Sequence, residues 1–367
     1  MGIAFEPTRA LPNVAFRSSE WAAAEREAIW HGDWVFVTSE DAIAEPGDQL
    51  PLVIDDQPVL LLRDQDGQLV ALSNLCAHRG TLLVDELTNA KRIQCPYHAW
   101  TFADDGRLLS VPFSPRGEVD RDAHCLPSYR VEAWHGLVFI SLNPDVEPLA
   151  TRFAAVDQLL VDAGIDDLHH WPAQYESDEW ACNWKLAILN AMESYHLFHV
   201  HPETLEPYTP TKDAYYIQGS ARSTATGGSV AKADDYVLVS LPPGFVGVFT
   251  MGSFVWQAVY PIAVGRCTVR TGGAFATPPP EKAGGLLSRL ATQAGMAASS
   301  AFVPDFLPED KAICERGQRG ATGDFDPARL LEVERVVADF GHYLAWKLLG
   351  LEPTDVHVAE PQGAEQA

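Results

Sequence analysis

The sequence has few of the features that mark membrane, disulfide-linked or nucleic-acid-binding proteins. No apolar run approaches the roughly 18 residues of a membrane-spanning helix, and residues 1–7 have neither the basic nor the apolar region of a secretory signal. Six cysteines in 367 residues do not make a disulfide framework. Only 26 basic residues accompany 50 acidic ones, a net charge of −24 that argues against a nucleic acid partner. We therefore expect a globular protein of the reducing cytoplasm that is not inserted in a membrane.

Two pairs of cysteine and histidine stand close together in the first third of the chain. One residue separates Cys76 from His78, and two residues separate Cys95 from His98. Two thiolates on one iron and two imidazoles on the other can hold a [2Fe–2S] cluster, whose reduction potential the neutral imidazoles raise to roughly −150 to +300 mV. A structural zinc site uses the same residue types, but zinc fingers group the cysteines apart from the histidines, whereas here they alternate. The pattern favours an iron–sulfur cluster that accepts and passes on one electron.

The hydrophobic pattern changes near residue 150, and a chain of this length has room for two domains. Before that point a helix over 19–31 is followed by short alternating segments with a hairpin turn at 64–67. Strands are expected at 33–38, 50–54, 59–63, 69–73 and 137–142. We expect an N-terminal helical segment at 1–35 that packs on the second domain, an all-β domain at 36–148, and the second domain at 149–367.

The second domain mixes helical and strand patterns, so the expected fold class is α+β. Helices are expected at 153–160, 183–200, 284–301 and 330–349, and strands at 236–241, 245–251, 254–260 and 265–275. Consecutive strands of this kind suggest an antiparallel sheet that walls a pocket. Residues 352–367 are expected to be polar and frayed.

Glu193, His196, His199 and His201 crowd into one short segment of this domain. Two imidazoles and one carboxylate that leave open coordination positions form the mononuclear non-haem iron site that activates O2. His196 and His199 share a helix face. His196 and His201 converge only if the helix ends between them, which Pro202 favours because the residue before a proline resists helical geometry. The spacing alone leaves both histidine pairs open.

These motifs resemble the catalytic α subunit of Rieske non-haem iron aromatic-ring-hydroxylating oxygenases. The resemblance rests on the two Cys–His pairs, on Asn183-Trp184-Lys185-Leu186, and on Asn190-x2-Glu193-x-Tyr195-His196-x4-His201. It implies a Rieske domain that holds the [2Fe–2S] cluster through Cys76, His78, Cys95 and His98. It also implies a catalytic domain of the helix-grip type, with an antiparallel sheet and covering helices.

The resemblance selects residues for the mononuclear Fe(II) site. The family's iron-binding histidines are separated by four residues, which implies His196 and His201 and leaves His199 as a bystander. The family's third ligand is a downstream aspartate, which implies Asp310, with Asp305 and Glu309 as alternatives.

Glu193 is a departure from the family pattern. The family usually has an aspartate at this position, which links a Rieske histidine of the neighbouring subunit to the iron-binding histidine. Glutamate keeps the carboxylate and is one methylene longer, so the resemblance implies a bridge from His98 through Glu193 to His196 across a subunit boundary. Asn190 belongs to the same motif and is the second candidate catalytic residue.

The resemblance also implies an activity. It indicates the oxygenase component of a multicomponent system, a homotrimer that takes electrons, ultimately from NAD(P)H, from a ferredoxin or flavin reductase. With O2 it would hydroxylate, dihydroxylate or demethylate a small organic substrate, either an aromatic compound or a quaternary amine. The alternative from another class is a Rieske electron-transfer or sensor protein with a ligand-binding domain and no oxygenase activity. Candidate residues for a cation-binding aromatic wall are Tyr208, Tyr215, Tyr216, Phe254 and Trp256, and those for a carboxylate clamp are Arg222, Arg266 and Arg270.

Overall fold

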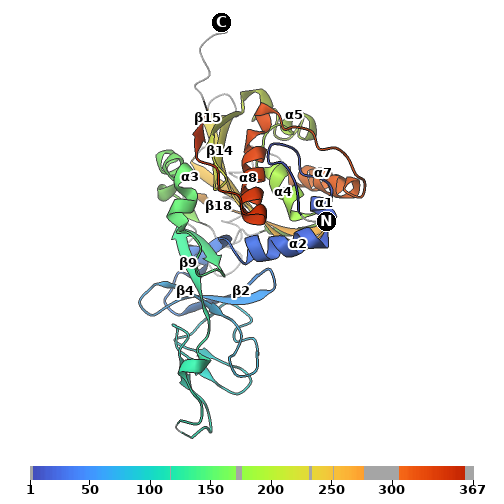
Figure 1. Cartoon of the computed structure of the whole chain (residues 1–367). Helices are drawn as coiled ribbons and strands as arrows, with labels where there is room; N and C mark the ends of the chain where they lie inside the picture. Colours follow the sequence, from blue (N-terminus) through green and yellow to red (C-terminus); the bar gives the residue numbers. More distant parts are fainter. Residues whose placement is uncertain are drawn as a thin grey trace. The chain divides into compact units, whose positions relative to one another are not determined.

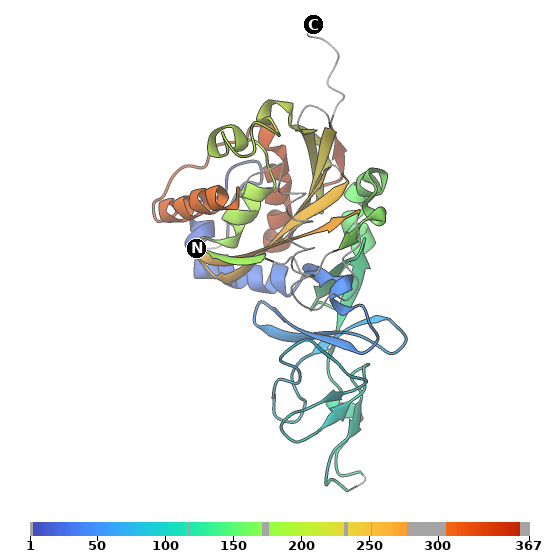
Figure 2. The same cartoon turned by 180° about the vertical axis from the view of Figure 1, so that it is seen from behind.

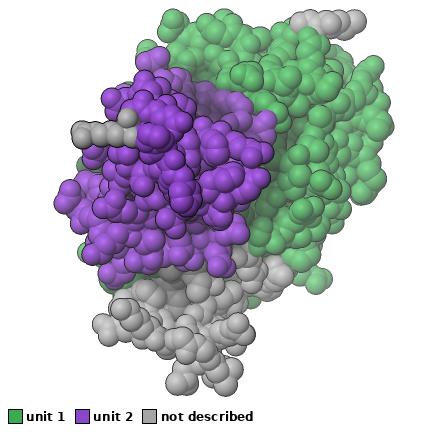
Figure 3. Space-filling model, turned by 90° about the horizontal axis from the view of Figure 1, so that it is seen from below, with its two compact units in different colours: residues 1–28, 150–367 green, residues 29–149 purple. Residues whose placement is uncertain are grey.

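The computed structural model describes residues 3–115, 117–170, 176–230, 234–250, 252–276 and 306–359. The chain forms two compact units, one of residues 29–149 and one of residues 1–28 with 150–367, coloured purple and green in Figure 3. Among the described helices, none combines the length and the apolar character that crossing a membrane requires.

The smaller unit is built on an antiparallel sheet with the strand order β1-β10-β9-β4-β3-β2-β5. Its strands are β1 (Val35–Ser39), β2 (Asp48–Ile54), β3 (Gln57–Arg63), β4 (Leu69–Ser73), β5 (Thr88–Asn89), β9 (Ser128–Trp134) and β10 (Leu137–Ser141). The five strands expected here are confirmed, with ends that differ by at most two residues. The predicted β3–β4 turn forms because Gly67 adopts φ +82° and the Asp64 carboxylate accepts the backbone N–H groups of Asp66 and Gln68.

A second, smaller sheet of this unit holds the Cys–His loops. It has the order β6-β7-β8, with β6 at Ile93–Gln94, β7 at Thr101–Phe102 and β8 at Leu108–Ser110. The fully buried side chains of Leu60, Leu72 and Phe102 belong to one apolar cluster that also contains Cys76 and Cys95. The two cysteines are therefore held by the core of the unit, not by a flexible surface loop.

The larger unit contains an antiparallel sheet with the order β11-β18-β17-β16-β15-β14-β13-β19, and β12 also pairs with β18. Its strands are β11 (His169–His170), β12 (Glu176–Trp180), β13 (Tyr215–Gly219), β14 (Thr224–Val230), β15 (Asp234–Leu241), β16 (Phe245–Thr250), β17 (Ser253–Ala263), β18 (Arg266–Phe275) and β19 (His357–Val358). The four strands expected in this unit, β15 to β18, are confirmed. β19 corrects the expectation of a frayed end for residues 352–359; residues 360–367 lie outside the described part.

Helices cover one face of this sheet (Figures 1 and 2). α4 packs on β16, β17 and β18, α8 packs on β13 and β14, and α7 packs on α4. The helices of this unit include α1 (Val14–Arg17), α2 (Ser19–Glu25), α3 (Leu149–Ala163), α4 (Trp184–Ala191), α5 (Leu197–Val200), α7 (Leu307–Gly320) and α8 (Arg335–Leu349). The α+β fold class is confirmed. The helix expected at 284–301 lies outside the described residues.

The helix expected over 183–200 is wrong in one respect, because it is two helices. α4 ends at Ala191 and α5 begins at Leu197. Between them, the Glu193 carboxylate accepts the backbone N–H groups of Tyr195 and His196, as an N-cap side chain does. This local alternative to helical hydrogen bonds interrupts the helix where the candidate site residues begin. The last helix, expected from Leu330, begins only at Arg335 after a short 3-10 turn.

Candidate metal centres

The motif at 183–186 anchors α4 in the larger unit. Asn183 caps the helix by accepting the N–H of Lys185 at 3.1 Å. The Lys185 ammonium lies 2.5 Å from Glu25 Oε1, and Trp184 Nε1 donates to Glu25 Oε2 at 2.8 Å. Burial lowers the pKa of Lys185, and the Glu25 carboxylate opposes that shift. This buried pair holds α4 against α2 and thereby fixes the segment that follows α4.

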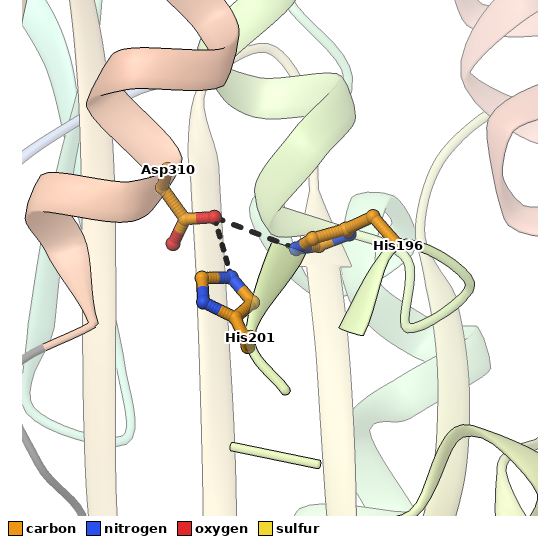
Figure 4. A group of neighbouring side chains, drawn as sticks. All are labelled: His196, His201 and Asp310. Carbon is orange, nitrogen blue, oxygen red and sulfur yellow. Dashed lines mark hydrogen bonds and ion pairs between the residues drawn. The ribbon is translucent and has the colours of Figure 1, made fainter. Parts of the chain in front are cut away.

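His196 and His201, at the two ends of α5, converge with Asp310 of α7 (Figure 4). His201 Nε2 lies 2.9 Å and His196 Nε2 lies 3.4 Å from Asp310 Oδ1. His201 follows the end of α5 with non-helical backbone angles, and Asp310 lies in the first turn of α7. His201 is 0% and Asp310 6% exposed. Two imidazole nitrogens and one carboxylate oxygen therefore face one another in a nearly closed site.

A second carboxylate holds the far side of each imidazole. His196 Nδ1 lies 2.6 Å from Glu193 Oε1, and His201 Nδ1 lies 2.7 Å from Glu309 Oε2. Thr204 Oγ1 donates to the same Glu309 oxygen at 2.5 Å. A metal-binding histidine usually donates its other N–H group to a carboxylate or carbonyl, which fixes the tautomer that presents a lone pair to the metal. The donor set therefore fits a divalent iron held by two imidazoles and one carboxylate.

The electrostatics of this site favour positive charge. Burial lowers the pKa of His196, but hydrogen bonds with Asp310 and Glu193 outweigh burial and raise the pKa to about 9. The pKa of His201 is raised in the same way by Asp310 and Glu309, against burial. Burial raises the pKa of Asp310, but the hydrogen bonds with the two histidines outweigh burial, so the pKa lies below its ordinary value. Three carboxylates around two imidazoles thus stabilise either protons or a cation.

The other residues proposed for this site lie around it. His199 is exposed and its ring lies tilted beside the Phe198 ring, outside the group formed by His196, His201 and Asp310. Glu309 faces the far side of His201. Asp305 lies outside the described residues. Asn190 and Glu193 line a cavity of about 350 Å³. Sequence reasoning missed Thr204 and Glu25, because their roles depend on partners more than 100 positions away.

The aromatic and arginine candidates for substrate binding have other contacts. Tyr216 donates a hydrogen bond to Asp339 at 2.7 Å. Phe254 and Trp256 are buried side chains of β17 that pack on Phe245. The arginine contacts are Arg222 with the Trp346 ring, Arg266 with Glu179, and Arg270 with the Tyr260 ring. Tyr208 is partly buried and Tyr215 is 45% exposed. These contacts give no support to an aromatic cage built from Tyr216, Phe254 and Trp256.

The two Cys–His loops of the smaller unit are closed by equivalent backbone hydrogen bonds. The N–H of Gly80 donates to the carbonyl of Cys76 at 2.9 Å, and that of Ala99 donates to the carbonyl of Cys95 at 3.0 Å. Gly80 and Ala99 have φ values of +70° and +56°, so the backbone turns sharply after each Cys–His pair.

The donors of these loops are arranged asymmetrically. Cys76 and Cys95 are 3% and 2% exposed, whereas His78 is exposed and His98 partly buried. The two imidazole rings lie 4.9 Å apart between centroids, and His78 stacks on Trp100. Burial raises the pKa of the Cys76 thiol, and the neighbouring Cys95 raises it further. Buried sulfurs on one side and imidazoles toward the surface fit a cluster with a thiolate-bound and an imidazole-bound iron.

Comparisons with known proteins match one segment in each of the two units. Residues 33–130 match the Rieske [2Fe-2S] domain family, and residues 165–238 match the ring hydroxylating alpha subunit (catalytic domain) family. The chain is 34% identical over 205 residues to the anthranilate 1,2-dioxygenase large subunit of Burkholderia cepacia, covering 52% of this chain and 47% of that protein. It is 32% identical over 196 residues to the glycine betaine monooxygenase oxygenase subunit of Chromohalobacter salexigens, covering 53% and 44%. The chain thus spans about half the length of the curated relatives it matches.

Solved structures extend the likeness in fold over almost the whole chain. A quaternary ammonium Rieske monooxygenase superposes with a TM-score of 0.78 at 23% identity, over 93% of this chain and 96% of that one. A naphthalene 1,2-dioxygenase superposes with a TM-score of 0.77 at 18% identity, over 94% and 93%. The two domain families imply a Rieske cluster and a mononuclear iron as cofactors. The chain therefore contains one segment similar to the Rieske [2Fe-2S] domain and one similar to the catalytic domain of ring hydroxylating alpha subunits, in line with the resemblance of its motifs.

Proposed function

We propose that this chain is the oxygenase component of a multicomponent Rieske oxygenase. It takes electrons, ultimately from NAD(P)H, from a ferredoxin or flavin reductase and uses them with O2 to oxidise a small organic substrate. The convergence of His196, His201 and Asp310 in a chain that also has a Rieske domain supports this proposal most strongly. An electron carrier or sensor has no need of a second metal site with open coordination positions.

The residues have separate roles in this proposal. Cys76 and Cys95 hold one iron of the cluster, and His78 and His98 hold the other. His196, His201 and Asp310 hold the mononuclear iron, which when bound supplies the activation of O2.

The glutamates act on the histidines. Glu309 and Glu193 accept hydrogen bonds from the Nδ1–H groups of His201 and His196. Each Nε2 then presents its lone pair to the metal on the side of Asp310. Thr204 donates to Glu309 and keeps that carboxylate oriented. Burial of His201 and Asp310 excludes bulk water from the ligand side of the site.

Electron transfer in this proposal crosses a subunit boundary. We assign Glu193 as the bridge between His196 of one subunit and His98 of the partner subunit, in a head-to-tail homotrimer. Two observations support a bridging position: Glu193 contacts His196, and it also lines an open cavity together with Asn190.

The cellular setting and the domain boundaries belong to the same proposal. All six cysteines are free, which suits a reducing cytoplasm. The domain boundaries at 36–148 and 149–367, with 1–35 as a segment that packs on the catalytic domain, are proposed as well.

The substrate is an aromatic compound or a quaternary amine, since the chain is similar both to an anthranilate dioxygenase subunit and to a glycine betaine monooxygenase subunit. The test is an oxygen-uptake screen with a surrogate reductase, in which aromatic acids, arenes, betaines and carnitine are offered in turn. We expect uptake that depends on one substrate class, with incorporation of ¹⁸O from ¹⁸O₂ into the product or release of formaldehyde on demethylation. About three irons per chain are expected. About two irons, together with no substrate-dependent uptake, would favour the electron-carrier alternative.

A further inference from the structure

One histidine and two aspartates of the smaller unit form a further group of potential metal ligands. His31 follows the short π-helix Arg26–Trp30, and Asp55 and Asp56 form the turn of the hairpin that joins β2 to β3. One nitrogen of His31 and one oxygen of each carboxylate all lie within 4.8 Å of one another. Neither the Cys–His loops nor the candidate iron site of the larger unit uses these residues.

His31 Nε2 lies close to both carboxylates without a hydrogen bond to either. It is 3.2 Å from Asp55 Oδ2 and 3.5 Å from Asp56 Oδ1. The nitrogen is enclosed by protein, yet it has no hydrogen-bond partner among the described residues, because neither oxygen lies along the direction of its N–H group or lone pair. An ion pair between a protonated histidine and a carboxylate favours an aligned hydrogen bond of about 2.7–2.9 Å. The observed contacts are longer and unaligned, so a simple ion pair does not explain them.

These separations are those of neighbouring ligands around one metal ion. With metal–nitrogen and metal–oxygen distances of about 2.1 Å, two ligand atoms are about 3.0 Å apart at a right angle and about 3.4 Å apart in a tetrahedron. Each ligand atom then points at the ion and not at its neighbour, which agrees with the missing hydrogen bond of His31 Nε2. The nitrogen–oxygen distances at Asp310, in the candidate iron site, are 2.9 and 3.4 Å and fall in a similar range.

The donor types select the class of ion. Two carboxylates and one neutral imidazole balance the charge of a divalent cation. Imidazole favours zinc and other divalent transition-metal ions over magnesium and calcium, and a donor set without thiolate disfavours Cu⁺. The Asp56 side chain is 49% exposed, so a hydrated ion can reach the group and exchange its water for the protein ligands.

We propose that His31, Asp55 and Asp56 bind a divalent transition-metal ion of the Zn²⁺ type, at a site separate from both iron centres. The ion connects the first residues of the smaller unit to the β2–β3 hairpin, and β3 contributes to the apolar cluster that contains the two loop cysteines. An ion that binds only the folded state stabilises it in proportion to the logarithm of the ion concentration above the Kd. The site is therefore structural, and it does not depend on the proposed oxygenase function.

The test is equilibrium dialysis of the iron-loaded full-length protein against a series of chelator-buffered Zn²⁺ solutions. Zinc and iron per chain are measured together by mass spectrometry, and the visible spectrum and the melting temperature are recorded at each step. We expect one zinc per chain in addition to the iron, half-saturated at micromolar free Zn²⁺, with unchanged iron content and spectrum. The melting temperature should rise with free Zn²⁺. Zinc that enters only by replacing iron would count against the site.

Matched variants assign the zinc to this group. His31→Gln removes the nitrogen donor and should lose the added zinc. Asp56→Asn changes a half-exposed side chain, so the fold is retained, and it should need at least about tenfold more free Zn²⁺ for half-saturation. Asp66→Asn removes the same charge from an exposed turn residue of the next hairpin and should bind zinc as the wild type does. The proposal is overturned if the wild type takes up no zinc beyond its iron, or if both site variants bind zinc as Asp66→Asn does.

Discussion

His201 Nε2 lies 2.9 Å from Asp310 Oδ1, although 109 positions separate the two residues. The contact depends on the packing of α7 against α4 and α5. His196 Nε2 lies near the same Asp310 oxygen. On the other side of the His201 ring, the Glu309 carboxylate contacts Nδ1 and orients the ring. The site therefore has an inner set of donors and an outer set of carboxylates, and the two sets respond differently to substitution.

Removal of one inner donor should release the mononuclear iron and leave the cluster intact. We expect His201→Ala to reduce the iron content from about three to about two atoms per chain, with an unchanged visible spectrum. Iron analysis by mass spectrometry together with the spectrum checks this. The control is His199→Ala, which removes an exposed imidazole of the same segment and should keep about three irons. Equal iron content in the two variants would rule out His201 as a ligand.

Replacement of a buried loop cysteine should remove the cluster. Cys76→Ser is expected to abolish the visible absorption and the electron paramagnetic resonance signal of the reduced cluster, because a Rieske iron needs both thiolates. Cys125→Ser, a substitution in the same unit, should leave both signals unchanged. An unaltered signal in the Cys76 variant would exclude this cysteine as a cluster ligand.

Glu193 should affect electron transfer more than metal content. Glu193→Ala removes the carboxylate 2.6 Å from His196 Nδ1 and leaves the inner donors in place. We expect both metals to remain bound, while oxidation of the reduced cluster in a single turnover slows by at least about tenfold. Rapid-mixing spectroscopy measures that rate. The control, Glu203→Gln, alters an exposed carboxylate nearby and should transfer electrons at the wild-type rate. Transfer at that rate in Glu193→Ala would show that the bridge is unnecessary.

The local parts of the fold and of the candidate site could be predicted from sequence. The Cys–His pairs and the segment from Glu193 to His201 place their donors within a few residues of one another, so spacing alone suggests their chemistry. Strands β15 to β18 are largely apolar runs separated by short glycine-containing turns, so they could also be predicted from local sequence. β14 was missed because Gly227 and Gly228 stand where large apolar side chains would mark a strand. A Cβ on Gly228 would come within 2.5 Å of the Tyr236 ring, so the packing of the sheet requires the glycine.

The long-range contacts could not be predicted in this way. The break between α4 and α5 depends on the Glu193 side chain, which a helical pattern does not reveal. α7 was not expected, because its sequence is polar and its buried face is narrow, with Asp310 and Cys314 as its buried residues. Asp310 was selected by family resemblance, and its neighbours became visible only in the folded chain.

Asp339 should make the stability of the protein depend on pH. Burial raises the pKa of Asp339 above its ordinary value, although Tyr216 and His357 oppose the shift. The folded state therefore binds this proton more tightly than the unfolded state does. Protonation of Asp339 therefore stabilises the folded state. This contribution is fully present below the pKa of Asp339 in the unfolded state and is lost as pH rises through its pKa in the folded state. Above the folded pKa the wild type carries the full cost of the buried charge, about 1.4 kcal/mol for each unit of upward shift.

Asp339→Asn removes that charge and keeps an acceptor for the Tyr216 hydroxyl. We expect a higher melting temperature than that of the wild type at about pH 8 and a smaller difference at about pH 5. The exposed Asp355→Asn variant controls for the loss of one negative charge. A difference between Asp339→Asn and wild type that does not change with pH would contradict the predicted titration.

The most direct test of the oxygenase proposal is a single turnover without any reductase. The protein is reduced chemically in the absence of O2, freed of reductant, and mixed with ¹⁸O₂ and the substrate found in the uptake screen. We predict that the cluster is reoxidised and that labelled product, or formaldehyde in the case of demethylation, appears in an amount comparable to the occupied iron sites; His201→Ala should form none. Product formation by the wild type and by His201→Ala alike, or reoxidation of the wild-type cluster without any product, would contradict the proposal.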